Sequence, residues 1–101
     1  MKPPPGAVRL SGRLICGSER EAAILREQLL EHVRLSRAEP GCLTFDVSGD
    51  VSGTEDPLVW RVEECFRDRA AFEHHQQRTR ASPWWSATRS IRREYEVTGP
   101  D

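Results

Sequence analysis

The feature that most constrains the fold of this chain is the order in which two hydrophobic periods follow one another. From Val8 to Gly17 apolar residues alternate with polar ones, which is typical of a half-buried strand. The same alternation returns at residues 42–49, 58–66 and 91–97, and helix signals lie between the segments. A length of 101 residues leaves no room for a second core, so all of these elements must share one domain.

The signals for a first helix lie directly behind the first strand. Ser18 and Glu21 form a capping box, in which each side chain accepts a hydrogen bond from the backbone N–H of the other residue. One apolar stripe follows at spacings of three and four residues, at Ala22, Leu25, Leu29 and Val33. The turn Glu39-Pro40-Gly41 then ends the helix and leads into the second strand.

Two further helices are predicted behind the third strand. Asp68 is a favourable N-cap, and the helix that it begins carries Phe72 and His75 on one face. Ser82-Pro83 is a second start signal, for a short helix with the pair Trp84-Trp85. Neighbours on a helix project about 100° apart. We therefore expect one of the two tryptophans to face the interior and the other to lie at a pocket rim or a dimer contact.

The resulting order predicts a ferredoxin-like α+β domain, βαββαβ with an extra short helix, in which one antiparallel sheet has helices on one face. We place this domain at residues 8–98, behind a disordered N-terminal arm at residues 1–7 with three prolines. Residues 50–57 contain a glycine, a proline and three acids and are expected to join a hairpin. In the second strand we expect Leu43 to share the buried face with its apolar neighbours Phe45 and Val47.

Size, charge and cysteine content bear on the partners of this domain. So small a chain, with 31% charged residues, buries little core, and a second copy over the open sheet face would enlarge it. We therefore expect a homodimer. The formal net charge of −1 argues against nucleic acid and membranes as partners. Three cysteines without a CxxC pair and an N-terminus without an apolar segment favour reduced thiols and a cytoplasmic location.

Two motifs resemble those of a known family. The turn Glu39-Pro40-Gly41-Cys42 is similar to the EPGC turn of the antibiotic biosynthesis monooxygenase domain, and residues 64–75 (ECFRDRAAFEHH) are similar to its pattern of glutamate, aromatic, acid and histidine. The resemblance covers nearly the entire chain. It implies a dimeric α+β barrel, in which two sheets meet face to face and each protomer keeps a small pocket between sheet and helices. Many relatives are cofactor-independent monooxygenases acting on quinols or polyketide-type aromatic phenols.

The resemblance carries Glu64 and His75 onto functional positions of the family. The second histidine of many relatives would fall at residues 78–80, where this chain has Arg-Thr-Arg. Some relatives bind and degrade haem with an asparagine on the first strand and a tryptophan near position 66. This chain has no asparagine on that strand, and residue 66 is Phe66, so we expect neither haem nor another cofactor.

The residues themselves point to the same pair. His75 is suited to accept a phenolic proton, because histidine titrates near neutral pH. Glu64 lies on an otherwise apolar strand face and needs a partner, which we expect to be His75 or Arg93. The alternative without catalysis is a core histidine satisfied by Glu64. For an aromatic ligand we expect a pocket lined by Trp60, Phe66, Phe72, Trp84 and Tyr95.

No metal site is expected, since His74 and His75 are adjacent and project in different directions, and His32 is expected to be exposed on another helix. The leading hypothesis is a small oxygenase without cofactor, in which His75 deprotonates a dihydroxy-aromatic substrate and the anion passes an electron directly to O2. A non-catalytic dimer that binds a small ligand and a cofactor-free isomerase or cyclase are the alternatives.

Overall fold

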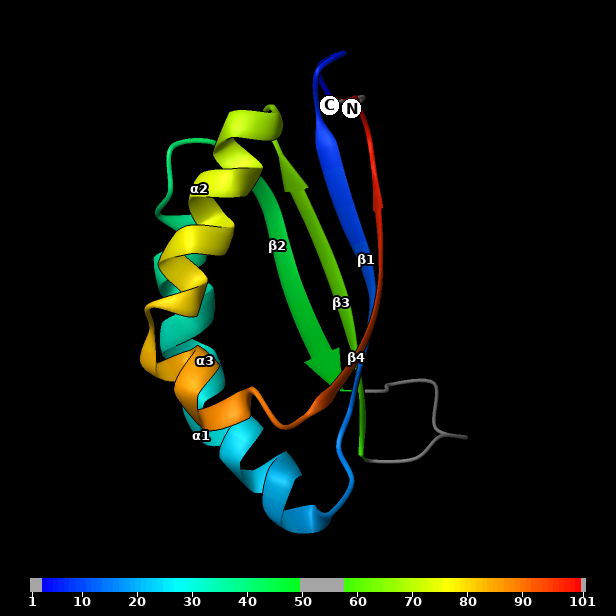
Figure 1. Cartoon of the computed structure of the whole chain (residues 1–101), viewed down its shortest axis with the longest axis vertical. Helices are drawn as coiled ribbons and strands as arrows, with labels where there is room; N and C mark the ends of the chain where they lie inside the picture. Colours follow the sequence, from blue (N-terminus) through cyan, green and yellow to red (C-terminus); the bar gives the residue numbers. More distant parts are fainter. Residues whose placement is uncertain (1–2, 50–57, 101) are drawn as a thin grey trace.

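The computed structural model describes residues 3–49 and 58–100, so the expected hairpin loop at 50–57 lies outside the described residues. One antiparallel sheet carries three helices (Figure 1). Its elements are β1 (Val8–Ile15), α1 (Glu19–Arg37), β2 (Cys42–Gly49), β3 (Val59–Phe66), α2 (Arg69–Arg80), α3 (Pro83–Thr88) and β4 (Arg92–Thr98). The predicted α+β class and ferredoxin-like element order are confirmed. No helix in the described ranges is long and apolar enough to cross a membrane.

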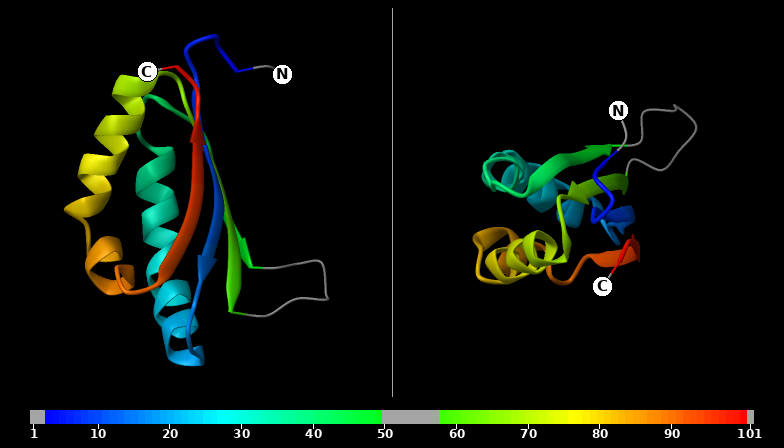
Figure 2. Two further views of the ribbon diagram at one scale, coloured as in Figure 1. Left: turned by 45° about the vertical axis from the view of Figure 1, so that its right-hand side comes forward. Right: turned by 90° about the horizontal axis from the view of Figure 1, so that it is seen from above.

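The strands lie in the order β2-β3-β1-β4, and each pairs antiparallel with its neighbours. The described helices all lie on one face of this sheet, as the two views of Figure 2 show. The sheet is open, with β2 and β4 at its edges, and does not close into a barrel within one chain. The second face of the sheet therefore has no helix of the described chain over it.

Each helix begins at the residue that its cap signal predicts. The Ser18 side chain accepts a hydrogen bond from the Glu21 N–H at 3.2 Å. The Asp68 carboxylate does the same for Ala71 at 2.8 Å, and Ser82 Oγ accepts from Trp85 N–H at 3.4 Å. Such caps satisfy backbone donors that have no partner within the helix, which is why these local signals locate the helix starts.

The core lies between the helices and the sheet. Leu10 and Leu14 of β1 and Phe45 of β2 are almost fully buried there, and burial of one such side chain contributes about 1.5–3 kcal/mol. Leu43 is different, because 44% of its surface is exposed. The pairing of β2 with β3 shifts register between Cys42 and Thr44, so Leu43 lies in an irregularity of the strand. The prediction that Leu43 shares the buried face is wrong for this reason.

The strands β1 and β4 approach each other closely at Gly12, where an added Cβ would overlap the backbone carbonyl of Glu94. We expect Gly12→Ala to lower the free energy of unfolding by roughly 1–3 kcal/mol, because β4 must move to make room. Gly49→Ala is the matched control, since a Cβ there would lie 3.8 Å from the Trp60 ring, at ordinary contact distance. Urea unfolding measures both variants, and equal stabilities would contradict the close approach at Gly12.

Candidate active site

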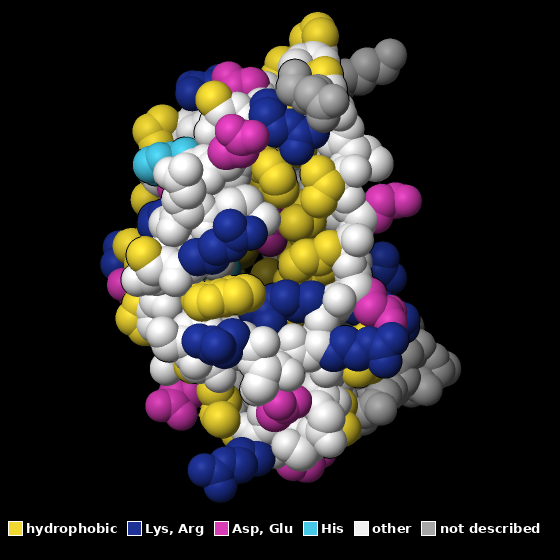
Figure 3. Space-filling view, in the orientation of Figure 1, with side chains coloured by type: hydrophobic (Ala, Val, Ile, Leu, Met, Phe, Trp, Pro, Cys, Tyr) yellow, Lys and Arg dark blue, Asp and Glu magenta, His cyan; other side chains and the backbone are white. Residues whose placement is uncertain are grey.

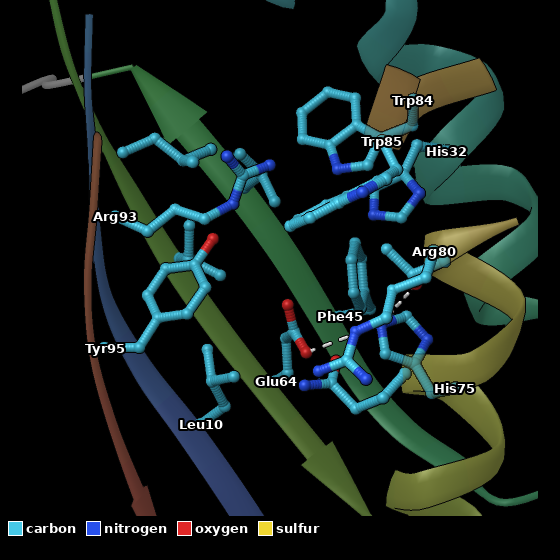
Figure 4. A pocket seen from close by; sticks show the side chains of 15 residues that line it. Leu10, His32, Phe45, Glu64, His75, Arg80, Trp84, Trp85, Arg93 and Tyr95 are labelled. Atoms are coloured by element: carbon cyan, nitrogen blue, oxygen red, sulfur yellow. Dashed lines mark hydrogen bonds and ion pairs between the residues drawn. The ribbon is translucent and has the colours of Figure 1, made fainter. Parts of the chain in front are cut away.

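A cavity of about 180 Å³ lies between the sheet and the helices, and every strand and helix contributes to its lining. Figure 3 shows a hollow there, with hydrophobic and arginine side chains around it. Apolar side chains that also belong to the core form much of the wall, among them Leu10, Leu14, Phe45, Val62 and Trp84. Polar groups also reach this space, namely Glu64, His75, Thr79, Arg80, Arg93 and Tyr95 (Figure 4).

His75 lies on α2 and is 2% exposed, with its ring centroid 4.8 Å from that of Phe66 and 5.4 Å from that of Phe45. Its Nδ1 atom lies 3.1 Å from Glu39 Oε2. Its Nε2 atom lies 3.3 Å from Thr79 Oγ1 and 3.7 Å from Glu64 Oε1. The two ring nitrogens therefore face different partners, one in the protein interior and one beside the cavity.

Glu39 explains which nitrogen of His75 carries the proton. This residue follows α1 in the Glu39-Pro40-Gly41 turn and is buried. Its Oε2 atom accepts a hydrogen bond from Arg78 Nε at 2.5 Å, while Arg78 Nη2 donates to Ser36 Oγ at 2.8 Å. A carboxylate so placed is a hydrogen-bond acceptor, so His75 donates to it through Nδ1–H and keeps Nε2 as its own acceptor.

The sequence pattern does not predict the contact between Glu39 and His75. It indicates only that Glu39 belongs to the turn that ends the first helix. The partners are separated by 36 positions in the chain. The signal that was available is an acid in a tight turn that leads straight into a buried strand, because such an acid requires a partner.

Glu64 lies on β3 and is buried, with 7% of its surface exposed. Burial raises its pKa to about 8, and the nearby Glu39 carboxylate adds to this rise. Burial also lowers the pKa of His75, which Glu39 opposes. Near neutral pH a protonated Glu64 therefore faces a neutral imidazole. Among the described residues Glu64 Oε1 has no hydrogen-bond partner.

The two partners expected for Glu64 are His75 and Arg93. His75 lies opposite Glu64, at a distance longer than a hydrogen bond. Arg93 instead donates to the Thr88 backbone oxygen at 2.8 Å and to Thr88 Oγ1 at 2.9 Å, so its guanidinium is directed to the end of α3. Of the two partners considered, the structure brings His75 near Glu64 and ties Arg93 to α3.

His32 was expected to be exposed, and this is wrong. The residue is 4% exposed and its ring stacks parallel to Trp84, with centroids 4.4 Å apart. Burial is the main reason why the pKa of His32 falls to about 3, so the ring is neutral. Helical spacing contained the signal, because His32 follows Leu25 by seven residues and thus lies two turns along the same face. His32 also lines the cavity.

The aromatic residues expected in the pocket are divided between cavity and core. Trp84 and Tyr95 line the cavity, and so does Trp85, which is only half-buried. The others lie elsewhere: Phe66 and Phe72 contact each other in the core with centroids 5.7 Å apart, and Trp60 lies partly buried beside Gly49. No cluster of three or more His, Cys, Asp or Glu side chains among the described residues is placed to hold a metal ion.

Comparisons with known proteins give the following findings. The family model "Antibiotic biosynthesis monooxygenase" matches residues 18–84, a range that contains both motifs noted in the sequence. None of the curated proteins matches the chain.

Solved structures are similar in fold. A candidate antibiotic biosynthesis monooxygenase from Nitrosomonas europaea has a TM-score of 0.78 at 16% identity, with 99% of this chain and 95% of that chain covered. SnoaB, a cofactor-independent oxygenase from Streptomyces nogalater, has a TM-score of 0.75 at 12% identity, with coverage of 95% and 94%. Rv0793 from Mycobacterium tuberculosis has a TM-score of 0.69 at 23% identity, with coverage of 93% and 94%.

The raised pKa of Glu64 predicts how the stability of the protein depends on pH. Its pKa in the folded protein, about 8, exceeds the ordinary value of 4.5, so between these values the folded state holds a proton that the unfolded state has released. The contribution of Glu64 to stability is therefore lost as pH rises through about 8. Glutamine does not titrate, so Glu64→Gln should not show this loss. We expect the free energy of unfolding of the variant, relative to that of the wild type, to increase by about 2 kcal/mol or more from pH 5 to pH 9.

Urea unfolding at a series of pH values measures this difference. The exposed Glu73 on α2 provides the control, since Glu73→Gln should leave the pH dependence unchanged. A difference between Glu64→Gln and wild type that stays constant over the range would show that Glu64 titrates normally.

Proposed function

The chain belongs to the antibiotic biosynthesis monooxygenase family, and from this premise we propose that it is a small cofactor-independent oxygenase that oxidises a quinol or a related aromatic phenol. The observation that carries the proposal is the buried pair of Glu39 and His75, because it leaves the acceptor nitrogen of His75 on the side of the cavity. SnoaB, which has a similar fold, is a cofactor-independent oxygenase.

In the proposed reaction His75 is the general base. The O–H bond of the phenol breaks, its proton moves to Nε2 of His75, and the electron pair stays on the phenolate oxygen. Glu39 accepts a hydrogen bond from Nδ1–H throughout and stabilises the imidazolium that forms. For this transfer the Thr79 hydroxyl must turn away from Nε2, so that the lone pair of this nitrogen is available to the substrate.

The phenolate then reduces O2 and forms a C–O bond with it. Loss of water leaves a hydroxylated quinone, so that one hydroquinone and one O2 give one hydroxyquinone and one water. The substrate supplies every electron in this sum. Glu64 is a hydrogen-bond donor while it is protonated, and in this state it stabilises the phenolate rather than competing for its proton. The apolar wall strengthens both interactions by excluding water.

We expect His75→Gln to lower kcat for hydroquinone oxidation at least about a hundredfold, since a general base contributes a factor of this order. Glu39→Gln should cost roughly tenfold and shift the pH profile of kcat/KM to lower pH, because Glu39 raises the pKa of His75. Oxygen consumption at a series of pH values measures both effects. The exposed neighbour provides the control, and His74→Gln should behave as wild type. Full activity of His75→Gln would contradict the assignment of the base.

A non-catalytic ligand-binding protein is the second candidate, and one observation favours it. Burial lowers the pKa of His75 and the Thr79 hydroxyl already contacts Nε2, and both features weaken the imidazole as a base. Binding of hydroquinone without oxygen uptake, under air, identifies this function. Product formation without oxygen uptake identifies an isomerase or cyclase instead.

We also propose that two chains form a homodimer through their open sheet faces. Like charges lie opposite each other on this face, with Arg13 across from Arg61 on the neighbouring strand and Asp46 across from Glu63. Such pairs destabilise an isolated sheet. Arg13 already pairs with Glu94 and Asp46 with Arg37, whereas Arg61 and Glu63 have no ion pair among the described residues. A second sheet that places its Glu63 near Arg61 of the first would neutralise both charges, which supports a partner of the same composition.

Sedimentation velocity at micromolar concentration should therefore find a dimer. We expect Arg61→Glu to weaken it at least about tenfold, because charge reversal at an interface replaces attraction by repulsion. Arg26→Glu changes net charge equally, on the exposed side of α1, and should leave the dimer intact. A wild-type chain that sediments as a monomer would contradict this proposal and leave the oxygenase proposal to its own test.

A further inference from the structure

The cavity lining has an excess of positive charge. Arg80 and Arg93 line it, and Glu64 is the one carboxylate in the described lining. Neither arginine forms an ion pair with a carboxylate in the described part of the chain. Burial raises the pKa of Glu64 to about 8, which keeps this group neutral near pH 7, and Glu39 is already paired with Arg78. The space therefore faces two cations without a counter-ion.

Arg93 is fixed in place before any ligand arrives. Its Nη1 donates to the backbone oxygens of Thr88 and Ile91 at 2.8 and 3.0 Å, and its Nη2 donates to Thr88 Oγ1 at 2.9 Å. Its guanidinium carbon also lies 5.0 Å from the centre of the Trp85 ring. A ligand that binds Arg93 therefore does not have to immobilise a flexible side chain, which is a large part of the usual cost.

The donors of Arg93 that these contacts leave are suited to a carboxylate. A guanidinium has five N–H groups, and one of them donates to the Tyr95 hydroxyl. The second Nη2–H remains, and the Tyr95 O–H is itself left to donate because its oxygen accepts from Arg93. These two donors can each bind one oxygen of a carboxylate, with the charge of the guanidinium beside it. Figure 4 shows the Tyr95 hydroxyl directed toward Arg93 from the same strand, where it can donate to the same anion. Arg80 is exposed at the end of α2 and adds charge where the cavity opens.

The volume limits the rest of the ligand. A cavity of roughly 150 Å³ is enough for benzene, so about 180 Å³ is sufficient for one aromatic ring. We propose that the substrate is a single-ring phenol that carries a carboxylate, and that Arg93, with Tyr95 and Arg80, binds this carboxylate. The inference rests on the proposed function only where it puts the phenol at His75. The anion site depends on Arg93, Tyr95 and Arg80 and on the absence of a charged carboxylate beside them in the described lining.

Two probes that share a ring test this inference, hydroquinone and 2,5-dihydroxybenzoate. Calorimetry at pH 7 should find that the wild type binds the acid at least about tenfold tighter, as expected for a charge-assisted hydrogen bond. Arg93→Gln should weaken binding of the acid roughly tenfold and leave hydroquinone unchanged. Arg80→Gln should weaken the acid roughly threefold and reduce the salt dependence of its binding. The exposed Arg89 lies outside the lining, so Arg89→Gln is the control.

Equal affinity of the wild type for both probes, or no binding of either, would overturn the anion site, as would a loss in Arg93→Gln that affects both probes equally. If circular dichroism shows that Arg93→Gln is unfolded, the wild-type preference and Arg80→Gln decide the question. Oxygen uptake separates this inference from the proposed function. If the acid binds more tightly but no oxygen is consumed, the anion site is supported and the oxygenase proposal is rejected. If oxygen is consumed but both probes bind with equal affinity, the oxygenase proposal is supported and the anion site is rejected.

Discussion

The structure depends on how one oxygen of a buried carboxylate is paired, since Glu39 Oε2 accepts two hydrogen bonds while its Oε1 has no partner among the described residues. Removing Glu39 from water costs several kcal/mol unless partners replace the lost hydration. The replacements come from α2, as Arg78 and His75 both donate to the same oxygen, and Arg78 also reaches Ser36 on α1. These contacts join the end of α1 to the C-terminal half of α2. The hydrogen bond between Glu39 and His75 therefore has two effects. It offsets part of the cost of burying Glu39, and it fixes the orientation of the His75 ring.

The second buried carboxylate has the opposite environment. Glu39 contacts a guanidinium and an imidazole at hydrogen-bond distance. Glu64 has no guanidinium partner in the described part of the chain and lies 3.7 Å from the imidazole, and its pKa rises to about 8. Glu64 is thus a hydrogen-bond donor near neutral pH on one side of His75, while Glu39 accepts a hydrogen bond from the other side of the ring. A carboxyl group that burial keeps protonated beside a neutral histidine is an arrangement that acid–base chemistry at neutral pH uses. This asymmetry supports a catalytic reading of the site more strongly than His75 alone does.

The sequence predicted the strands and the starts of the helices, which are determined locally. Strand alternation and the caps at Ser18, Asp68 and Ser82 located the elements, because each signal lies within a few residues of its effect. Leu43 was misplaced because a register shift depends on the neighbouring strand. The contact of Glu39 with His75 joins positions far apart in the chain, and no periodicity encodes it. Helical spacing is sufficient to predict the burial of His32, whereas the polar character of the imidazole favours an exposed position.

Different residues of the cavity lining determine the stability of the protein and its choice of ligand. Its apolar wall consists of residues such as Leu14, Phe45 and Val62, which also form the core, so that a change there leaves a void and costs about 2–5 kcal/mol. Arg80 and Arg93 differ, since the first is exposed at the end of a helix and the second lies half-buried on an edge strand. Solved structures share this fold at identities of 12–23%, so the architecture tolerates replacement of most side chains. A fold of this kind can keep its core while its rim changes, and the chemical class of the ligand is therefore to be sought in the charges at the rim rather than in the fold itself.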